Sequence, residues 1–155
     1  MKINAIVNLI NRKLAGELLS YYELSGFMDD VIDDINDELG STFPVFTDID
    51  NTTDEYDFFP DRWIRQVVVY GTAWYFYVMD EEGISNAQTY QQLYFDNLFK
   101  MTRDYFDDVP EEYVQGYVDP TTLEEDEEAP ESHEGTLGED TGEDTVIING
   151  SNWRI

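Results

Sequence analysis

One stretch of the chain, residues 60–105, limits the possible folds more than any other. Apolar and aromatic side chains recur there with the three- and four-residue spacing of a helix face, on both sides of the turn Glu81-Glu82-Gly83. This pattern predicts a helical hairpin with an aromatic seam. The first half is rich in β-branched residues and could form a strand, but its length exceeds that of an ordinary strand. We expect the seam to contain Trp63, Val67, Tyr70, Trp74, Tyr77, Tyr90, Tyr94, Leu98 and Met101.

Two further helices are predicted before the hairpin. Apolar residues follow one helix face from Ile3 to Leu19. Ser20 with Glu23 forms a capping-box pattern, which predicts a second helix that ends at Gly40. Residues 45–58 are expected to be an ordered loop that includes a short strand, and a second capping box, residues 85–88, should open the last helix. The fold class is therefore mainly α, a small four-helix bundle over residues 1–106.

The composition changes after the bundle. Residues 107–144 form an acidic arm with the run Glu-Glu-Asp-Glu-Glu at 124–128, and such a composition cannot build a core. Residues 145–155 are β-prone and contain an Asn-Gly turn signal. We interpret them as a docking segment in which Val146, Ile148 and Trp153 fill pockets on a partner. A disordered tail is the alternative.

The charge excludes several functions. Eight basic residues against 35 acidic ones give a formal net charge of −27 and a sequence pI of about 4.1. Such a chain repels the phosphates of nucleic acid and anionic membranes. It contains no cysteine, and its apolar runs are too short to cross a bilayer. We therefore expect a soluble protein that binds no membrane.

No pattern predicts catalysis. Asp48-x-Asp50-x-Thr52 resembles the start of a calcium loop, but Thr53 stands where that loop needs glycine. Carboxylates on the second predicted helix could suggest a nuclease, yet the one histidine, His133, lies in the acidic arm. A solvated or lumen-facing surface fits these carboxylates better. We expect no enzyme, no metal and no cofactor, and an acidic face that includes Asp30, Asp33 and Asp37.

Basic residues are expected to meet at one end of the hairpin. Two lie at the start of its first helix and two at the end of its second, and antiparallel packing brings these ends together. They could pair internally with Asp61, Asp104, Asp107 and Asp108, or they could form an intersubunit patch that meets an acidic surface of a neighbour. The four residues are Arg62, Arg65, Lys100 and Arg103.

The order of these segments resembles a family of viral assembly proteins. The segments INRKLAGELLSYYELSGFMDDVIDDINDEL, FPVF, FFPDRWIRQVVVYGTAWYFYVMDEEG and AQTYQQLYFDNLFKMTRDY resemble the head-to-tail connector, or neck adaptor, proteins of tailed bacteriophages. The resemblance covers residues 10–105. Its strongest correspondences are Pro60, the step Tyr70-Gly71-Thr72-Ala73, the turn at residues 80–83 and the helix carrying Tyr90 and Tyr94.

The resemblance implies a structural virion protein without catalytic residues. Copies made in the host cytoplasm would form a ring of about twelve subunits in the neck of the particle, where the portal joins the tail. Its partners would be further copies of itself, the portal protein, and the tail or a second neck protein. DNA would pass through the ring without being specifically bound, which suits a bore lined by carboxylates.

A protein of a different class would also explain the charge. An acidic inhibitor that mimics DNA could block a nucleic-acid-binding protein. Such a mimic would spread its carboxylates over a compact surface, whereas many carboxylates of this chain lie in the arm. Rings or incorporation into particles would favour the adaptor, and a monomer that competes with DNA would favour the mimic.

Overall fold

The computed structural model describes residues 1–49, 52, 54–80 and 83–121. The chain divides into two compact units, Met1–Gln115 and Gly116–Ile155. Of the second unit, residues 116–121 are described, so the arm beyond them and the predicted docking segment lie outside the described residues. The first unit is mainly helical, as the sequence predicts. Its described residues form no strand, only the isolated bridges Lys2↔Glu55 and Ser41↔Val114.

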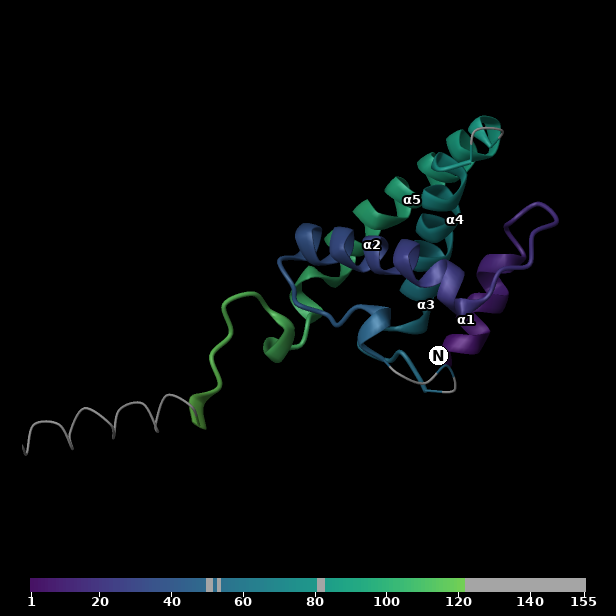
Figure 1. Cartoon of the computed structure of the whole chain (residues 1–155). Coiled ribbons are helices and arrows are strands. Elements are labelled where there is room, and N and C mark those ends of the chain that lie inside the picture. The colour runs from purple at the N-terminus through teal and green to yellow at the C-terminus, as the bar shows by residue number, and fades with distance from the viewer. Residues whose placement is uncertain (50–51, 53, 81–82, 122–155) are drawn as a thin grey trace, which may run out of the picture. The chain divides into compact units, whose positions relative to one another are not determined.

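The second predicted helix is confirmed at both ends. It is α2, Tyr21–Leu39 (Figure 1). The Ser20 hydroxyl accepts a hydrogen bond from the backbone N–H of Glu23, whose side chain bonds back to Ser20, so the capping box is complete. At the other end Gly40 has the left-handed backbone conformation, with φ of 64°, that stops a helix.

The first predicted helix is shorter than its apolar pattern suggests. The helix α1 is Ile3–Asn11 and does not reach Leu19. The side-chain amide of Asn11 donates to the carbonyl of Leu19 and accepts from its N–H, both at 2.9 Å, which closes residues 12–18 into a loop. Gly16, with φ of 80°, lies inside that loop. Leu18 follows the apolar pattern but is 85% exposed.

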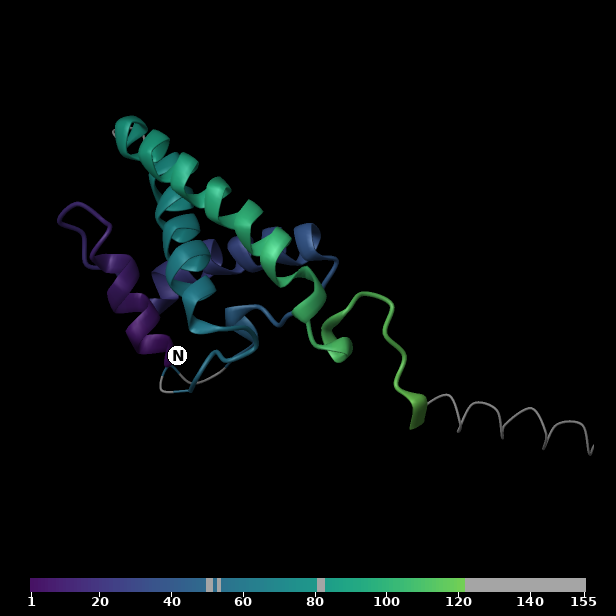
Figure 2. The same ribbon diagram turned by 180° about the vertical axis from the view of Figure 1, so that it is seen from behind.

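The hairpin is present, with an irregular first arm. This arm runs without a break through α3, Asp61–Trp63, the π-helical turn η2, Ile64–Val68, and α4, Val69–Val78. The second arm is α5, Ile84–Tyr105. Figures 1 and 2 show α4 and α5 side by side, with a tip that projects beyond α2. The predicted capping box at residues 85–88 does not form, because α5 begins after Gly83 without a side-chain cap.

The π-helical turn changes which side chains face the core. A π turn holds more residues than an α turn, so the helix after it is rotated relative to a regular helix. After the turn, Gly71 is the point of closest approach. A Cβ atom there would lie 2.6 Å from Cε1 of Tyr94 and 2.7 Å from Cγ2 of Val31. Gly71 therefore lets α4 pack directly against both α2 and α5.

The expected seam is only partly buried. Six of its members are buried, namely Trp63, Val67, Tyr77, Tyr94, Leu98 and Met101. Tyr70, Trp74 and Tyr90 are half-buried and pack against the core. For Tyr70 and Trp74 the rotation at the π turn gives a physical reason, since regular helical spacing no longer holds between Trp63 and the residues after η2.

A shared carboxylate links the hairpin to α2. Asp34 accepts hydrogen bonds from the hydroxyls of Tyr75 and Tyr94, both at 2.6 Å, through the same oxygen. Burial raises the pKa of Tyr94 above its ordinary value, and the hydrogen bond to Asp34 adds to the rise. Both tyrosines therefore stay protonated at neutral pH and hold α2, α4 and α5 together.

The first unit continues past the predicted boundary at residue 106. After α5 come two short 3-10 turns, η3, Phe106–Asp108, and η4, Glu111–Tyr113. The ring of Tyr113 packs against Phe43, and its carbonyl accepts from the N–H of Thr42 at 2.7 Å. The N–H of Gln115 donates to the carbonyl of Gly40 at 2.9 Å. These bonds attach residues 109–115 to the end of α2.

The loop before the hairpin contains a 3-10 turn where the sequence suggested a short strand. This turn is η1, Phe46–Asp48. The carboxylate of Asp29 accepts from the backbone N–H groups of Phe46 and Thr47, at 2.7 and 3.2 Å. Tyr56 is fully buried, stacks on Phe46 with ring centres 4.3 Å apart, and donates to the carbonyl of Pro44. The isolated aromatics of this loop thus extend the core.

Candidate functional site: a basic pocket beside the π-helical turn

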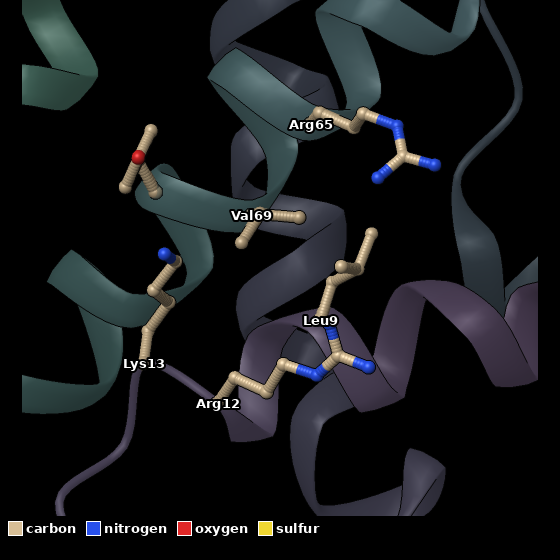
Figure 3. A pocket seen from close by; sticks show the side chains of 6 residues that line it. Leu9, Arg12, Lys13, Arg65 and Val69 are labelled. Atoms are coloured by element: carbon tan, nitrogen blue, oxygen red, sulfur yellow. The ribbon is translucent and has the colours of Figure 1, made fainter.

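A basic pocket lies between the end of α1 and the first arm of the hairpin. It has a volume of about 220 Å³ and is lined by Leu9, Arg12, Lys13, Arg65, Val69 and Tyr70. Figure 3 shows the side chain of Leu9 between the guanidinium groups of Arg12 and Arg65. The pocket adjoins a second one of about 260 Å³ that shares Leu9, Arg12 and Arg65 and continues along α1. Together they form a groove with an apolar floor and cationic walls.

The cations of this pocket are not neutralised by the part of the chain that the structure describes. Neither Arg12 nor Arg65 forms an ion pair or a side-chain hydrogen bond with a described residue. The amino group of Lys13 lies 5.3 Å from the ring centre of Tyr70, a cation–π contact that leaves its charge in place. Three of the eight lysines and arginines in the chain therefore surround one pocket, and none of its lining residues is acidic.

Hairpin tyrosines position the residues that carry two of these cations. The hydroxyls of Tyr77 and Tyr90 both donate to the carbonyl of Lys13 at 3.2 Å, and the N–H of Ala15 donates to Tyr77 at 2.6 Å. The two tyrosine rings stack with centres 5.8 Å apart. With the Asn11–Leu19 pair, these bonds hold residues 12–15 against the hairpin. The pocket is thus a consequence of how α1 ends.

Arg65, which lines the pocket, belongs to the π-helical turn. Turns of this kind are rare and are frequently found at functional sites. Arg65 is exposed, while Val67 and Val68 in the same turn are buried. The buried valines fix the turn against the core, and the arginine side chain projects into the groove (Figure 3).

Three residues of the predicted patch, Arg62, Lys100 and Arg103, act on the same carboxylate, that of Asp104. Arg103 donates a hydrogen bond to the carboxylate of Asp104 at 2.9 Å, and this bond lowers the pKa of Asp104. The charges of Arg62 and Lys100 lower the same pKa further. Arg65 lies instead in the basic pocket. The guanidinium of Arg62 also lies 4.3 Å from the ring centre of Trp63.

The basic pocket itself was not anticipated from the sequence. Its only sequence signal is the adjacent pair Arg12-Lys13. That pair follows the apolar pattern of α1 and resembles ordinary solvated residues. The contribution of Arg65, more than fifty positions away, depends on the tertiary structure.

The acidic residues of α2 divide into two groups. Asp29 and Asp34 are half-buried and accept the hydrogen bonds described above. The predicted acidic face, Asp30, Asp33 and Asp37, is exposed. Partial burial raises the pKa of Asp30, and the neighbouring carboxylates add to that rise. Like charges are thus crowded on this face.

A second groove is apolar with an acidic rim. It has a volume of about 450 Å³ and is lined by Phe27, Phe76, Met79 and Leu19, with Glu17, Glu23 and Asp80 around them. Met79 is 73% exposed, and the nearby hairpin-tip residues Val78 and Ile84 are exposed as well. This apolar groove therefore presents large hydrophobic side chains to solvent.

Two features are absent from the part of the chain that the structure describes. Within those residues, no group of three or more His, Cys, Asp or Glu side chains is arranged to hold a metal ion. No helix in the same residues is long and apolar enough to cross a membrane. In comparisons with known proteins, no family model, no curated protein and no solved structure matches this chain.

Proposed function

We propose that the protein is a structural subunit that assembles with copies of itself into a ring, the neck adaptor of a tailed bacteriophage. The observation that carries this proposal is the apolar groove at the base of the hairpin tip. A chain with a net charge of −27 repels its own copies, yet it exposes Met79 and the edges of Phe27 and Phe76. Exposed apolar clusters rimmed by polar groups mark protein–protein contacts.

The contact would be of the head-to-tail kind. A ring forms when one surface of each subunit meets a different surface of the next. The first unit carries an acidic-rimmed apolar groove and a basic pocket, which are different in character. Aromatic side chains, which are enriched at protein interfaces, account for 15% of the residues. Within this proposal, the assignment of the ring as the portal-to-tail adaptor is supported by the resemblance over residues 10–105 alone.

The ring can be tested with one substitution in the apolar groove. Met79→Glu adds a carboxylate to a groove that already has an acidic rim, so it should weaken self-association at least tenfold without affecting folding. Gln91→Glu, at an exposed position of α5, adds the same charge elsewhere and serves as the control. Analytical ultracentrifugation and electron microscopy of both variants measure the effect. Rings that persist in Met79→Glu as fully as in Gln91→Glu would refute this use of the groove.

The predicted role of the α2 acidic face has its own test. If Asp30, Asp33 and Asp37 line the bore, they keep DNA from binding to the ring. Their replacement by lysine should leave the fold intact, since all three are exposed. Virions that carry the triple variant should eject their DNA more slowly. Unchanged ejection kinetics would place this face elsewhere in the particle.

A DNA-mimic inhibitor remains the second candidate. The exposed row of Asp30, Asp33 and Asp37 favours it, because carboxylates at helical spacing can imitate a line of phosphates. The two functions predict different states of the purified protein. A monomer that displaces DNA from a nucleic-acid-binding protein would support the mimic, and rings without such competition would support the adaptor.

A further inference from the structure

We infer that the basic pocket binds the acidic run of residues 124–128 of a neighbouring copy of this chain. The inference deepens the proposed function, because it names a segment that would join adjacent subunits. The ligand class is a peptide with consecutive carboxylates. The cationic walls of the pocket are Arg12, Lys13 and Arg65.

The chemistry of the pocket matches such a peptide. Guanidinium groups bind carboxylates through paired, parallel hydrogen bonds, and a lysine ammonium adds a point charge. The run Glu-Glu-Asp-Glu-Glu provides five carboxylates in succession. Leu9 and Val69 between the cations provide an apolar floor for the CH₂ groups of glutamate side chains. The groove continues along α1 past Ala5 and Asn8, so more than one residue of a peptide can be accommodated.

The charge balance of the chain favours this occupant over nucleic acid. The chain has 35 acidic residues and only eight basic ones, so its net charge repels the phosphates of DNA. An acidic peptide approaches the same pocket as one short segment on a tether. Each copy also brings one such run for each pocket, so every pocket in a closed ring could be filled.

The geometry of the first unit favours a neighbouring copy over the same copy. The chain leaves this unit at Gln115, which is bonded to Gly40 at the C-terminal end of α2. The pocket lies beside Asn11, which is bonded to Leu19 at the N-terminal end of α2. The 19 residues of α2 separate these ends by roughly 28 Å.

Within one copy, the first residue of the run could reach that far only with a fully extended arm. From Gln115 the chain has nine steps to Glu124, at most about 30 Å, and thirteen to Glu128, at most about 43 Å. The whole run therefore fits the pocket of its own copy only if the arm is fully extended. The same run can reach the pocket of a subunit placed beside it.

Carbodiimide cross-linking of the full-length protein tests the inference. This reagent joins a lysine amine to a carboxylate in direct contact, and Lys13 is the lysine of the pocket. A mixture of unlabelled and ¹⁵N-labelled protein distinguishes links between copies from links within one copy. We expect mixed-isotope peptides that join Lys13 to residues 124–128. Lys100, which lies beside Asp104, is the control and should not link to that run.

Each alternative has a distinct outcome. Links with a single isotope composition would show that the run fills the pocket of its own copy, and would overturn the inference. Links from Lys13 to other carboxylates, or no links, would overturn it as well. A DNA mobility shift that is lost in the Arg12→Glu, Arg65→Glu variant would assign the pocket to phosphate instead.

A charge exchange separates this inference from the proposed function. Arg12→Glu with Arg65→Glu should reduce the Lys13 cross-links at least tenfold. Lysines at all five positions 124–128 should restore association in that background, measured by sedimentation. Circular dichroism checks that the exposed substitutions leave the fold intact. If rings form equally well in the Arg12→Glu, Arg65→Glu variant, the inferred binding of the acidic run in the pocket is wrong, but the adaptor function is not. If the wild-type protein never forms rings or enters virions, the adaptor function itself is wrong.

Discussion

Gly71→Ala tests the close packing of α4 against α2 and α5. The added Cβ would lie 2.6 and 2.9 Å from two ring carbons of Tyr94 and 2.7 Å from a methyl group of Val31. Neither neighbour can move easily. Tyr94 is fully buried and its hydroxyl is held by Asp34 at 2.6 Å, while Val31 is fully buried and β-branched. The substitution should therefore push α4 away from α2 and α5.

The magnitude follows from two opposing effects. An extra methyl group in a packed core costs about 1–3 kcal/mol. Alanine is better than glycine inside a helix by roughly 0.5–1 kcal/mol, which offsets part of that cost. The net loss in the free energy of unfolding should be about 1–2 kcal/mol. For a unit of this size the melting temperature should fall by roughly 3–10 °C.

Gly26→Ala is the matched control. Gly26 lies inside α2, and nothing is within 4 Å of a Cβ built there. It has the same gain in helix propensity without the clash, so its melting temperature should rise by a few degrees. Differential scanning calorimetry of both variants decides the matter. If Gly71→Ala is as stable as Gly26→Ala, the close approach of α4 to Tyr94 is wrong.

Three further predictions concern other contacts. Tyr94→Phe removes the hydrogen bond to Asp34 and should cost about 1.5–3 kcal/mol in urea unfolding. The pKa of Tyr94 is raised in the folded protein, so the stabilisation that Tyr94 gives is complete below about pH 10. Above that pH the free energy of unfolding should fall by about 1.4 kcal/mol per pH unit because of this group. If the free energy of unfolding falls no more steeply with pH in the wild type than in Tyr94→Phe, this expectation is wrong. Asn11→Ala breaks both bonds to Leu19 and should cost about 1–3 kcal/mol, whereas an unchanged urea midpoint would mean that the loop is held by other contacts. Trp63→Ala, at a buried position, should lower the free energy of unfolding by about 3–5 kcal/mol. Trp74→Ala, at a half-buried position, should lower it by less. If Trp74→Ala lowers the melting temperature more than Trp63→Ala does, the rotation at η2 is refuted.

Local signals in the sequence were sufficient for part of this fold. Ser20 with Glu23 and the stop at Gly40 define α2 because capping depends on neighbouring backbone groups alone. The hairpin likewise follows from periodic apolar spacing and a polar turn. The excess of carboxylates, and with it the repulsion of phosphate, also follows from composition alone.

Other features depend on backbone details that periodic patterns do not reveal. The helix α1 ends where Asn11 pairs with Leu19. The capping box predicted at residues 85–88 does not form, because α5 begins directly after Gly83. The π turn rotates the hairpin face in a way that no 3.6-residue pattern reveals.

Periodicity and charge are properties of short segments, so they suffice to predict a helical, strongly acidic chain with few cations. The positions of those cations follow only from how the segments pack. The tertiary structure ends α1 beside the hairpin, holds Lys13 with Tyr77 and Tyr90, and places Arg65 opposite Arg12 across an apolar floor. A pocket lined from two helices exists only once both are packed, since the residues that form it are separated along the chain.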